Sequence, residues 1–237
     1  MSITMNITDR IESVNPESTP EDFLSSSLSV IFPDAVANQH GDVHNALIYS
    51  SPRLPRRLRI DLSDPPSEED RLLFGHYLWN ASLLAAELVE GGTLGPAPAP
   101  WNDEGVIERR DGLRWEGGKK LGLPLRAFDV RDKTMIELGA GTALPSTMAT
   151  LLGAKEVCVT DYPSPALMET LKANVARNTA PENAPSGKVC PNLEVTGHSW
   201  GKLEGFEAKK HAYDIVVAAD CLVRPQHTPH PHPNHLE

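Results

Sequence analysis

From residue 129 onward, short apolar runs alternate with segments of helical spacing. Three of the runs have the composition of strands, namely 134–138, 157–160 and 193–196. Two intervening segments have the spacing of helices, 145–152 and 165 to about 178. A last run, 213–219, is apolar enough to lie at the centre of a sheet. This order predicts an α/β fold with a doubly wound, mostly parallel sheet, of which strands one to four are present.

A glycine-rich sequence, GAGTALPS, follows the first predicted strand and contains Gly139 and Gly141. Glycine permits a tight turn there and lets a ligand approach the backbone closely. In open α/β sheets ligands bind at the carboxyl ends of the strands. Asp161 ends the second predicted strand. Its carboxylate is placed to accept hydrogen bonds from the two hydroxyls of a ribose.

Several ligands compete for such a loop, and a turn without any ligand is the simplest alternative. A dinucleotide site would have glycine at position 144, where this chain has Leu144. A phosphate-binding P-loop is excluded because its Gly-Lys-Ser/Thr ending is missing. Glu137 precedes the loop and suits a cationic ligand better than a pyrophosphate. The pattern therefore favours S-adenosylmethionine, which combines a ribose with an ammonium and a sulfonium group.

The segments before the sheet are less regular. Residues 1–66 are expected to form an irregular extension with strands near 46–49 and 58–62. A helix is predicted to begin at Ser67 and to end at Gly91–Gly92. Residues 91–126 contain GPAPAP and two tryptophans without any period, so we expect a mobile surface insertion.

Composition limits the partners. The formal net charge of -10 argues against a nucleic-acid ligand, which would need clustered Lys and Arg. The chain starts without a signal peptide, and no apolar run is long enough to span a membrane. The three cysteines are far apart and lack metal-site spacing, which indicates a reducing, cytoplasmic location.

Several motifs together carry a family resemblance. The stretches ELGAGTALPS, VTDYPSPALMETLKANVARN, HSWG and YDIVVAADCL resemble successive motifs of the seven-strand S-adenosylmethionine-dependent methyltransferases. HYLWNASLLAAELVE is similar to the lysine-methyltransferase-like branch, and within it to fungal nicotinamide N-methyltransferase-like proteins. One relative in that group methylates the N-terminus and a nearby lysine of translation elongation factor 1-alpha. The resemblance covers roughly residues 56–90 and 128–222 and implies a Rossmann-like domain over 67–222.

The resemblance also implies roles for individual residues. Asp161 would hold the ribose, and Trp200 would lie against the adenine. Asp220 would be the catalytic residue, facing the methyl-transfer space and orienting an amine. The positions implied to bind the cofactor are Trp79, Glu137, Gly139, Ala140, Gly141, Asp161, Trp200 and Ala219.

Two kinds of substrate remain open at this point. A lysine or a terminal amine must lose a proton before it attacks, whereas a pyridine nitrogen need not. The resemblance and the acidic net charge favour a protein substrate such as an elongation factor over a small nicotinamide-type amine.

The end of the chain departs from the family pattern. After residue 222 the family would continue through three more strands. Here residues 223–237 consist of Val223 followed by RPQHTPHPHPNHLE, a sequence that predicts no strand or helix. We therefore expect the C-terminal strands to be missing and the chain to have little activity, or to be a non-catalytic binding module. The four tail histidines have no Cys or carboxylate partners in sequence, so no metal site is expected.

Overall fold

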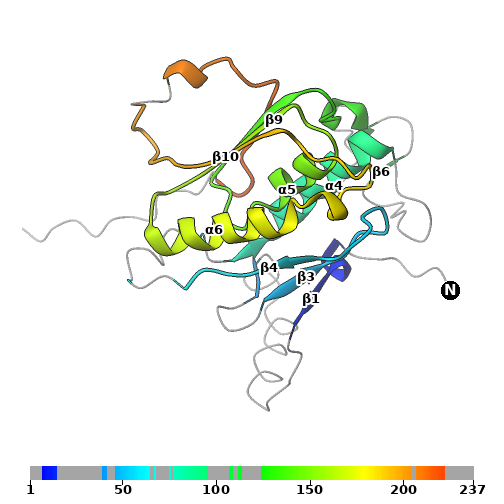
Figure 1. The fold of residues 1–237 in the computed structure, drawn as a ribbon, viewed down its shortest axis with the longest axis horizontal. Coiled ribbons are helices and arrows are strands. Elements are labelled where there is room, and N and C mark those ends of the chain that lie inside the picture. The colour runs from blue at the N-terminus through cyan, green and yellow to red at the C-terminus, as the bar shows by residue number, and fades with distance from the viewer. Residues whose placement is uncertain are drawn as a thin grey trace, which may run out of the picture.

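Four parallel strands form the central sheet. The computed structural model describes residues 7–14, 39–41, 46–64, 67, 75, 77–95, 107–108, 112–113, 124–203 and 207–221. The strands of the sheet lie in the order β10-β9-β8-β11. Every neighbouring pair is parallel, as predicted (Figure 1). Their bounds are β8 Thr134–Leu138, β9 Glu156–Asp161, β10 Asn192–Gly197 and β11 Ile215–Val217.

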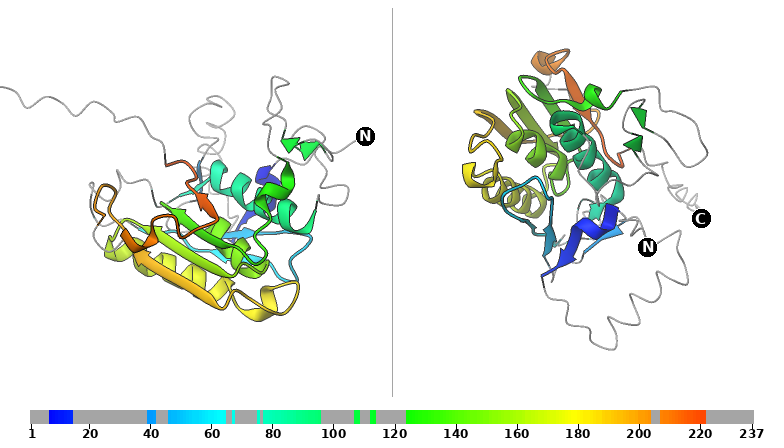
Figure 2. Two further views of the ribbon diagram at one scale, coloured as in Figure 1. Left: turned by 90° about the horizontal axis from the view of Figure 1, so that it is seen from above. Right: turned by 90° about the vertical axis from the view of Figure 1, so that its right-hand side faces the viewer.

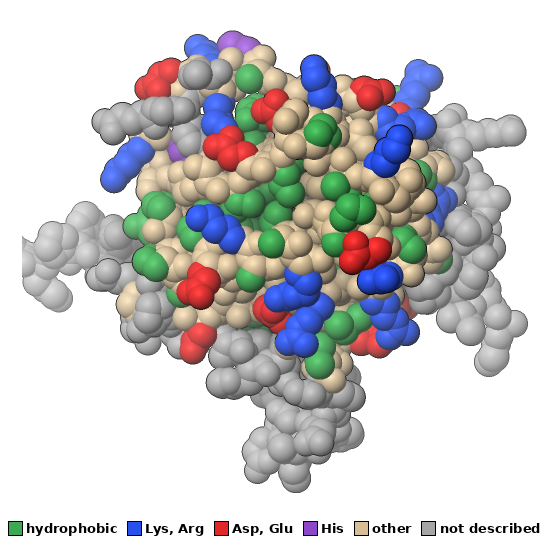
Figure 3. Space-filling view, viewed as in Figure 1, with side chains coloured by type: hydrophobic (Ala, Val, Ile, Leu, Met, Phe, Trp, Pro, Cys, Tyr) green, Lys and Arg blue, Asp and Glu red, His purple; other side chains and the backbone are tan. Residues whose placement is uncertain are grey.

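Three helices pack on one face of this sheet. They are α4 (Asn80–Leu94), α5 (Leu144–Leu151) and α6 (Pro165–Asn178). Met135, Val157 and Val159 are fully buried and belong to the core cluster that the sheet shares with the helices. Figure 3 shows hydrophobic side chains between α6 and β10, where Leu193 and Val195 pack partly buried against the core. The helix stripe and the alternation of the strands thus produce one apolar core.

A second, antiparallel sheet covers the other side of the helices. Its order is β1-β3-β4, with β1 at Ile11–Ser13, β3 at Leu47–Tyr49 and β4 at Leu58–Ile60. Figures 1 and 2 show the parallel sheet, the helices and this small sheet as three layers. Strands are therefore present in both stretches where the sequence predicts them. Because Tyr49 and Leu58 are fully buried in the same core cluster, this sheet packs as part of one structure.

Two asparagines of α6 bind the backbone of β4. The Asn174 Oδ1 accepts the Asp61 N–H at 2.9 Å, and its Nδ2 donates to the Asp61 carbonyl at 2.7 Å. Asn178 makes the same pair of bonds with Arg59, at 3.2 and 2.7 Å. The two side-chain amides thus form backbone hydrogen bonds of the kind that a neighbouring strand would form with β4, and they attach β4 to α6.

The predicted bounds of α4 are wrong at both ends. The helix begins at Asn80, because Leu78–Trp79 form a short strand, β5, that pairs antiparallel with β2 (Gln39–His40). It also continues through Gly91 and Gly92 to Leu94. A Cβ on Gly92 would lie 2.6 Å from the Phe128 carbonyl carbon and 2.7 Å from the Leu125 oxygen. Glycine is needed there for close packing against a 3-10 helix, and it does not end α4.

That packing also changes the bounds of the predicted insertion. Residues 91–94 belong to α4, and the insertion ends where the 3-10 helix η2 (Leu125–Phe128) packs against α4. Between them the structure describes only two short paired strands, β6 (Ile107–Glu108) and β7 (Gly112–Leu113). The remaining 3-10 helices are η1 (Ile7–Arg10), η3 (Pro181–Asn183) and η4 (Glu207–Lys209).

Several further predictions lie at the limits of the described residues. The predicted tail, 223–237, and its histidines lie outside them, as do 68–74 of the predicted helix. Within the described part of the chain, β11 pairs with β8 alone, so it is an edge strand there and not a central one. Its Val216 is 61% exposed. None of the described helices is long and apolar enough to cross a membrane.

A buried ionic cluster joins the small sheet to α4. The Arg10 guanidinium, at the end of η1, donates to Glu87 Oε2 at 2.7 Å and to Tyr49 Oη at 3.1 Å. It also lies 3.4 Å from Glu90 Oε1, and Ser51 Oγ donates to Glu90 Oε2 at 2.5 Å. Arg10 and Glu90 are almost fully buried. Charged groups in such a place are tolerated only because they are paired and hydrogen-bonded.

We expect Gly92→Ala to destabilise the protein, because the new methyl would overlap the backbone of η2. The expected loss is about 1 to 3 kcal/mol, the usual cost of overpacking. Gly91→Ala is the matched control, since its Cβ would meet only Leu125 side-chain carbons at 3.4 and 3.5 Å. That variant should be neutral or more stable by up to about 1 kcal/mol. Equal urea midpoints for the two variants would contradict the close-packing explanation.

We expect the stability of the protein to depend on pH through Glu87. Burial raises the pKa of Glu87 from 4.5 to about 7. A carboxyl with a raised folded-state pKa stabilises the fold fully below its unfolded pKa, and this contribution is lost as pH rises to about 7. Relative to the unaltered protein, Glu87→Gln should therefore gain about 1 to 3 kcal/mol on going from about pH 5 to about pH 8.

Urea denaturation at the two pH values measures this gain. Glu12→Gln is the control, because the Glu12 carboxylate forms an exposed ion pair with Arg57 and should contribute little at either pH. If Glu87→Gln and Glu12→Gln show the same pH dependence, Glu87 is not the titrating group.

Candidate cofactor site

The loop after β8 makes a left-handed turn at the carboxyl end of the sheet. Gly139 has φ 62° and Gly141 has φ 54°, values that glycine adopts without strain. Ala143, the residue before α5, is also left-handed, with φ 59°. This turn sends the chain directly from β8 into α5 and leaves the loop backbone at the place where ligands of α/β sheets bind.

Three other segments meet this loop. A Cβ on Gly141 would lie 3.6 Å from the Gly75 carbonyl oxygen and 3.8 Å from that of Tyr77. A Cβ on Gly139 would lie 2.8 Å from Cys221 Sγ and 3.6 Å from Trp200 Cζ2. The fold therefore brings the segment before α4, the loop after β10 and the residues after β11 together around the two glycines.

Asp161 lies directly beside the loop. Its Oδ2 accepts the Gly141 N–H and its Oδ1 accepts the Tyr162 N–H, both at 2.6 Å. Burial raises the pKa of Asp161, and the two backbone hydrogen bonds oppose that rise. The carboxylate is 8% exposed. The structure thus places this predicted residue at the end of β9 and against the glycine turn.

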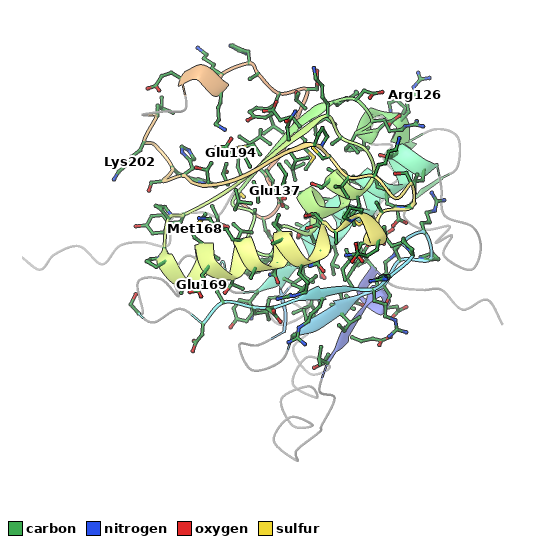
Figure 4. The ribbon with its side chains drawn as sticks, viewed as in Figure 1. Arg126, Glu137, Met168, Glu169, Glu194 and Lys202 are labelled. Atoms are coloured by element: carbon green, nitrogen blue, oxygen red, sulfur yellow. The ribbon has the colours of Figure 1, made fainter. Side chains whose placement is uncertain are left out.

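Glu137 is turned into the protein, toward α5. Its Oε2 accepts the Ser146 N–H at 3.0 Å and the Ser146 hydroxyl. The side chain is 1% exposed, and burial raises its pKa to about 7. Figure 4 shows Glu137 in the middle of the molecule, between the sheet and the helices. Oε2 of Glu137 is therefore occupied by its hydrogen bonds to α5. A direct contact between Glu137 and a ligand stays a prediction.

Of the two tryptophans predicted for the site, Trp200 lies beside the glycine loop, and Trp79 lies next to Tyr77 before α4. Trp200 is 56% exposed and its ring lies beside Gly139. Trp79 is partly buried at the start of α4, where its ring meets Tyr77 edge to face with centroids 6.2 Å apart. Ala140, between the glycines, is buried, and its N–H donates to the Thr160 carbonyl at 3.0 Å.

Ala219 and Asp220, the predicted site residues after β11, are joined to the end of β8 through Cys221. The Cys221 thiol donates to the Leu138 carbonyl at 3.0 Å and to the Ala219 carbonyl at 3.4 Å. Burial, together with the nearby Asp161, Glu137 and Asp220 carboxylates, raises the pKa of this thiol to about 11. Asp220 is exposed and adopts the left-handed φ of 59°. Sequence reasoning assigned Cys221 no role, although it follows the predicted catalytic Asp220 directly.

Thr142 is a second residue that sequence reasoning missed. It lies in the glycine loop and is 5% exposed. Its Oγ1 has no hydrogen-bond partner among the described residues. A buried hydroxyl without a partner is costly. Such a hydroxyl in a ligand-binding turn is a candidate ligand contact. The sequence indicated it only through the position of Thr142 inside the glycine-rich stretch GAGT.

Comparisons with known proteins agree on one family. The family model described as lysine methyltransferase matches residues 68–229. The chain is 35% identical over 105 residues to the protein N-terminal and lysine N-methyltransferase EFM7 of Gibberella zeae, covering 40% of this chain and 39% of that protein. The EFM7 of Candida glabrata is 42% identical over 120 residues, covering 46% and 43%.

A longer alignment exists with the EFM7 of Kluyveromyces lactis. It is 24% identical over 211 residues and covers 84% of this chain and 57% of the relative. The chain therefore spans less than two thirds of the length of each of these relatives. Since the family model matches more than half of its residues, the chain belongs to the lysine methyltransferase family.

Proposed function

We propose that the protein is an S-adenosylmethionine-dependent N-methyltransferase that acts on a protein amine, either a lysine or an N-terminus. The observation that carries the proposal is the match to relatives named protein N-terminal and lysine N-methyltransferase, together with the lysine methyltransferase family model over residues 68–229, which include the candidate site. Family membership implies the same methyl donor.

The residues around the loop fit this cofactor. Gly139 and Gly141 form a turn without side chains, and the buried Thr142 hydroxyl is free to bind a ligand group. Asp161, which lies against Gly141, would accept the ribose hydroxyls, and the exposed Trp200 ring would lie against the adenine. The Glu137 and Asp161 carboxylates, near the ends of β8 and β9, would attract a cationic ligand at this loop. When bound, the cofactor supplies a methyl group on a positively charged sulfur.

Asp220 is the proposed catalytic residue. It follows β11 at the carboxyl end of the sheet, and its side chain is exposed. Its left-handed backbone is unusual for a residue other than glycine, and such strain is concentrated at functional sites. A carboxylate there would hold an incoming amine by a charge-assisted hydrogen bond and accept its proton.

A lysine-rich segment of a translation elongation factor is the proposed substrate. The net charge of -10 attracts a basic segment more strongly than a neutral ring. The resemblance noted for the sequence supports an elongation factor as well, and such a substrate implies a cytoplasmic protein. The nicotinamide-like branch remains as the second candidate, with a small pyridine-type amine as its substrate.

Replacement of Asp161 should weaken cofactor binding. Asp161→Ala removes a proposed ribose acceptor and leaves the Gly141 N–H without its partner. We expect a loss of about 1 to 3 kcal/mol in calorimetric titration with S-adenosylmethionine. Glu194→Gln is the control, because Glu194 lies on β10 and its carboxylate binds Lys209. Unchanged affinity of Asp161→Ala, or tighter binding of NAD than of S-adenosylmethionine, would contradict the cofactor assignment.

The substrate class is tested with a version of the protein extended by the C-terminal part of a relative, since the chain covers 57% of the Kluyveromyces lactis protein. Labelled S-adenosylmethionine is supplied with either elongation factor 1-alpha or nicotinamide. We expect label in the elongation factor, and about a hundred-fold less transfer, or lower still, by Asp220→Asn, in line with the usual contribution of a general base. Label in nicotinamide alone would reverse the order of the two substrates. Cofactor binding without transfer to either would instead indicate a binding module.

A further inference from the structure

Helix α5 begins without a capping residue of its own. Ala143, at its N-cap, offers no side-chain hydrogen bond to the first turn. The first N–H groups of a helix need partners from outside the helix. Glu137, a strand residue, provides one of them by accepting the Ser146 N–H at 3.0 Å. The fully buried Ser146 hydroxyl donates to the same oxygen, Oε2.

This arrangement bears on the charge of Glu137. Burial alone disfavours an ionised carboxylate, and the nearby Asp161 carboxylate disfavours it further. The two Ser146 donors act in the opposite direction. The other titratable group that faces Glu137 in the described structure is the Cys221 thiol, which is held in its protonated form. Ser146 is therefore the group that opposes neutralisation of Glu137.

We propose that Ser146 is a positioning residue that favours the ionised form of Glu137 beside the glycine loop, and so strengthens the binding of a cationic cofactor there. Ser146 itself touches no ligand in this proposal and acts through Glu137. The inference rests on the proposed function for its ligand, but the state of Glu137 is a property of the protein alone.

Of the hydroxyls of α5, the Ser146 hydroxyl is the one that donates to Glu137. Thr150 is also fully buried, but its Oγ1 donates to the Ser146 carbonyl at 2.9 Å, within the helix. Removing the Thr150 hydroxyl costs the helix one hydrogen bond and leaves Glu137 with both donors. Thr150→Val, which keeps the side-chain shape, is therefore the matched control for Ser146→Ala.

The direct test follows Glu137 in the protein without ligand. Nuclear magnetic resonance of carboxyl-labelled glutamate, with Glu137→Gln to assign the signal, gives its titration. The pKa of Glu137 is about 7 with Ser146 in place. In Ser146→Ala it should rise by about one unit or more, as expected for the loss of a hydrogen bond to a charged group. In Thr150→Val it should stay unchanged.

The functional test measures binding by calorimetry between about pH 6 and about pH 9. S-adenosylmethionine is compared with its demethylated product, which has a neutral sulfur. At about pH 7, Ser146→Ala should bind S-adenosylmethionine several-fold more weakly, and affinity should recover about one pH unit higher than in the unaltered protein. The neutral-sulfur ligand should lose less, and Thr150→Val should bind both ligands as the unaltered protein does.

Each outcome decides one question. Equal losses for the two ligands without a pH shift, or an unchanged Glu137 titration, would overturn the proposal. If the unaltered protein binds no S-adenosylmethionine, the proposed function fails, and the titration of Glu137 alone decides the role of Ser146. If Ser146→Ala does not fold, Glu137→Gln replaces it and should bind S-adenosylmethionine weakly, with the same pH dependence as the demethylated product, because the α-amino group that both ligands carry also titrates in this range. A pH dependence of S-adenosylmethionine binding that still exceeds that of the demethylated product in Glu137→Gln would again overturn the proposal.

Discussion

The left-handed turn between β8 and α5 is the constraint on which the site depends. Because Gly139 has no Cβ, Cys221 Sγ can approach the loop closely, whereas Gly141 is needed for its left-handed φ of 54° rather than for space. Any side chain at Gly139 would displace Cys221, which ties the residues after β11 to the end of β8. The segments that carry the proposed cofactor residues therefore come together only with this turn in place.

The regular part of the fold could be predicted because local signals agreed with tertiary packing there. Proline at the first position of α6 and its apolar stripe matched the helix at Pro165–Asn178. The same reasoning failed for α4, where glycines usually end a helix. At Gly92 the requirement comes from η2, a partner more than thirty residues away in sequence, and no local pattern contains that contact.

The candidate site shows the same division between local and distant information. Asp161 and the two glycines were found because strand ends and turns have sequence signatures. The negative charge of Glu137 alone predicts a role in binding a cationic ligand. Its contact with Ser146 depends on how α5 packs against β8, which the sequence does not show. Thr142 was missed because its unpartnered hydroxyl is a property of packing. Sequence thus locates the loop, and only the structure shows which polar groups are already paired.

Helix α4 connects the site to the small antiparallel sheet. Its first residues follow Trp79 and Tyr77, whose carbonyl faces the glycine loop. Its last two turns carry Glu87 and Glu90, which bind Arg10 of η1 in the buried ionic cluster. The helix has 15 residues, which span about 22 Å at the usual rise per residue. The same helix thus follows the Tyr77 carbonyl beside the glycine loop and, further along, anchors η1 through Arg10, so the N-terminal segment packs on an element that the cofactor site also uses.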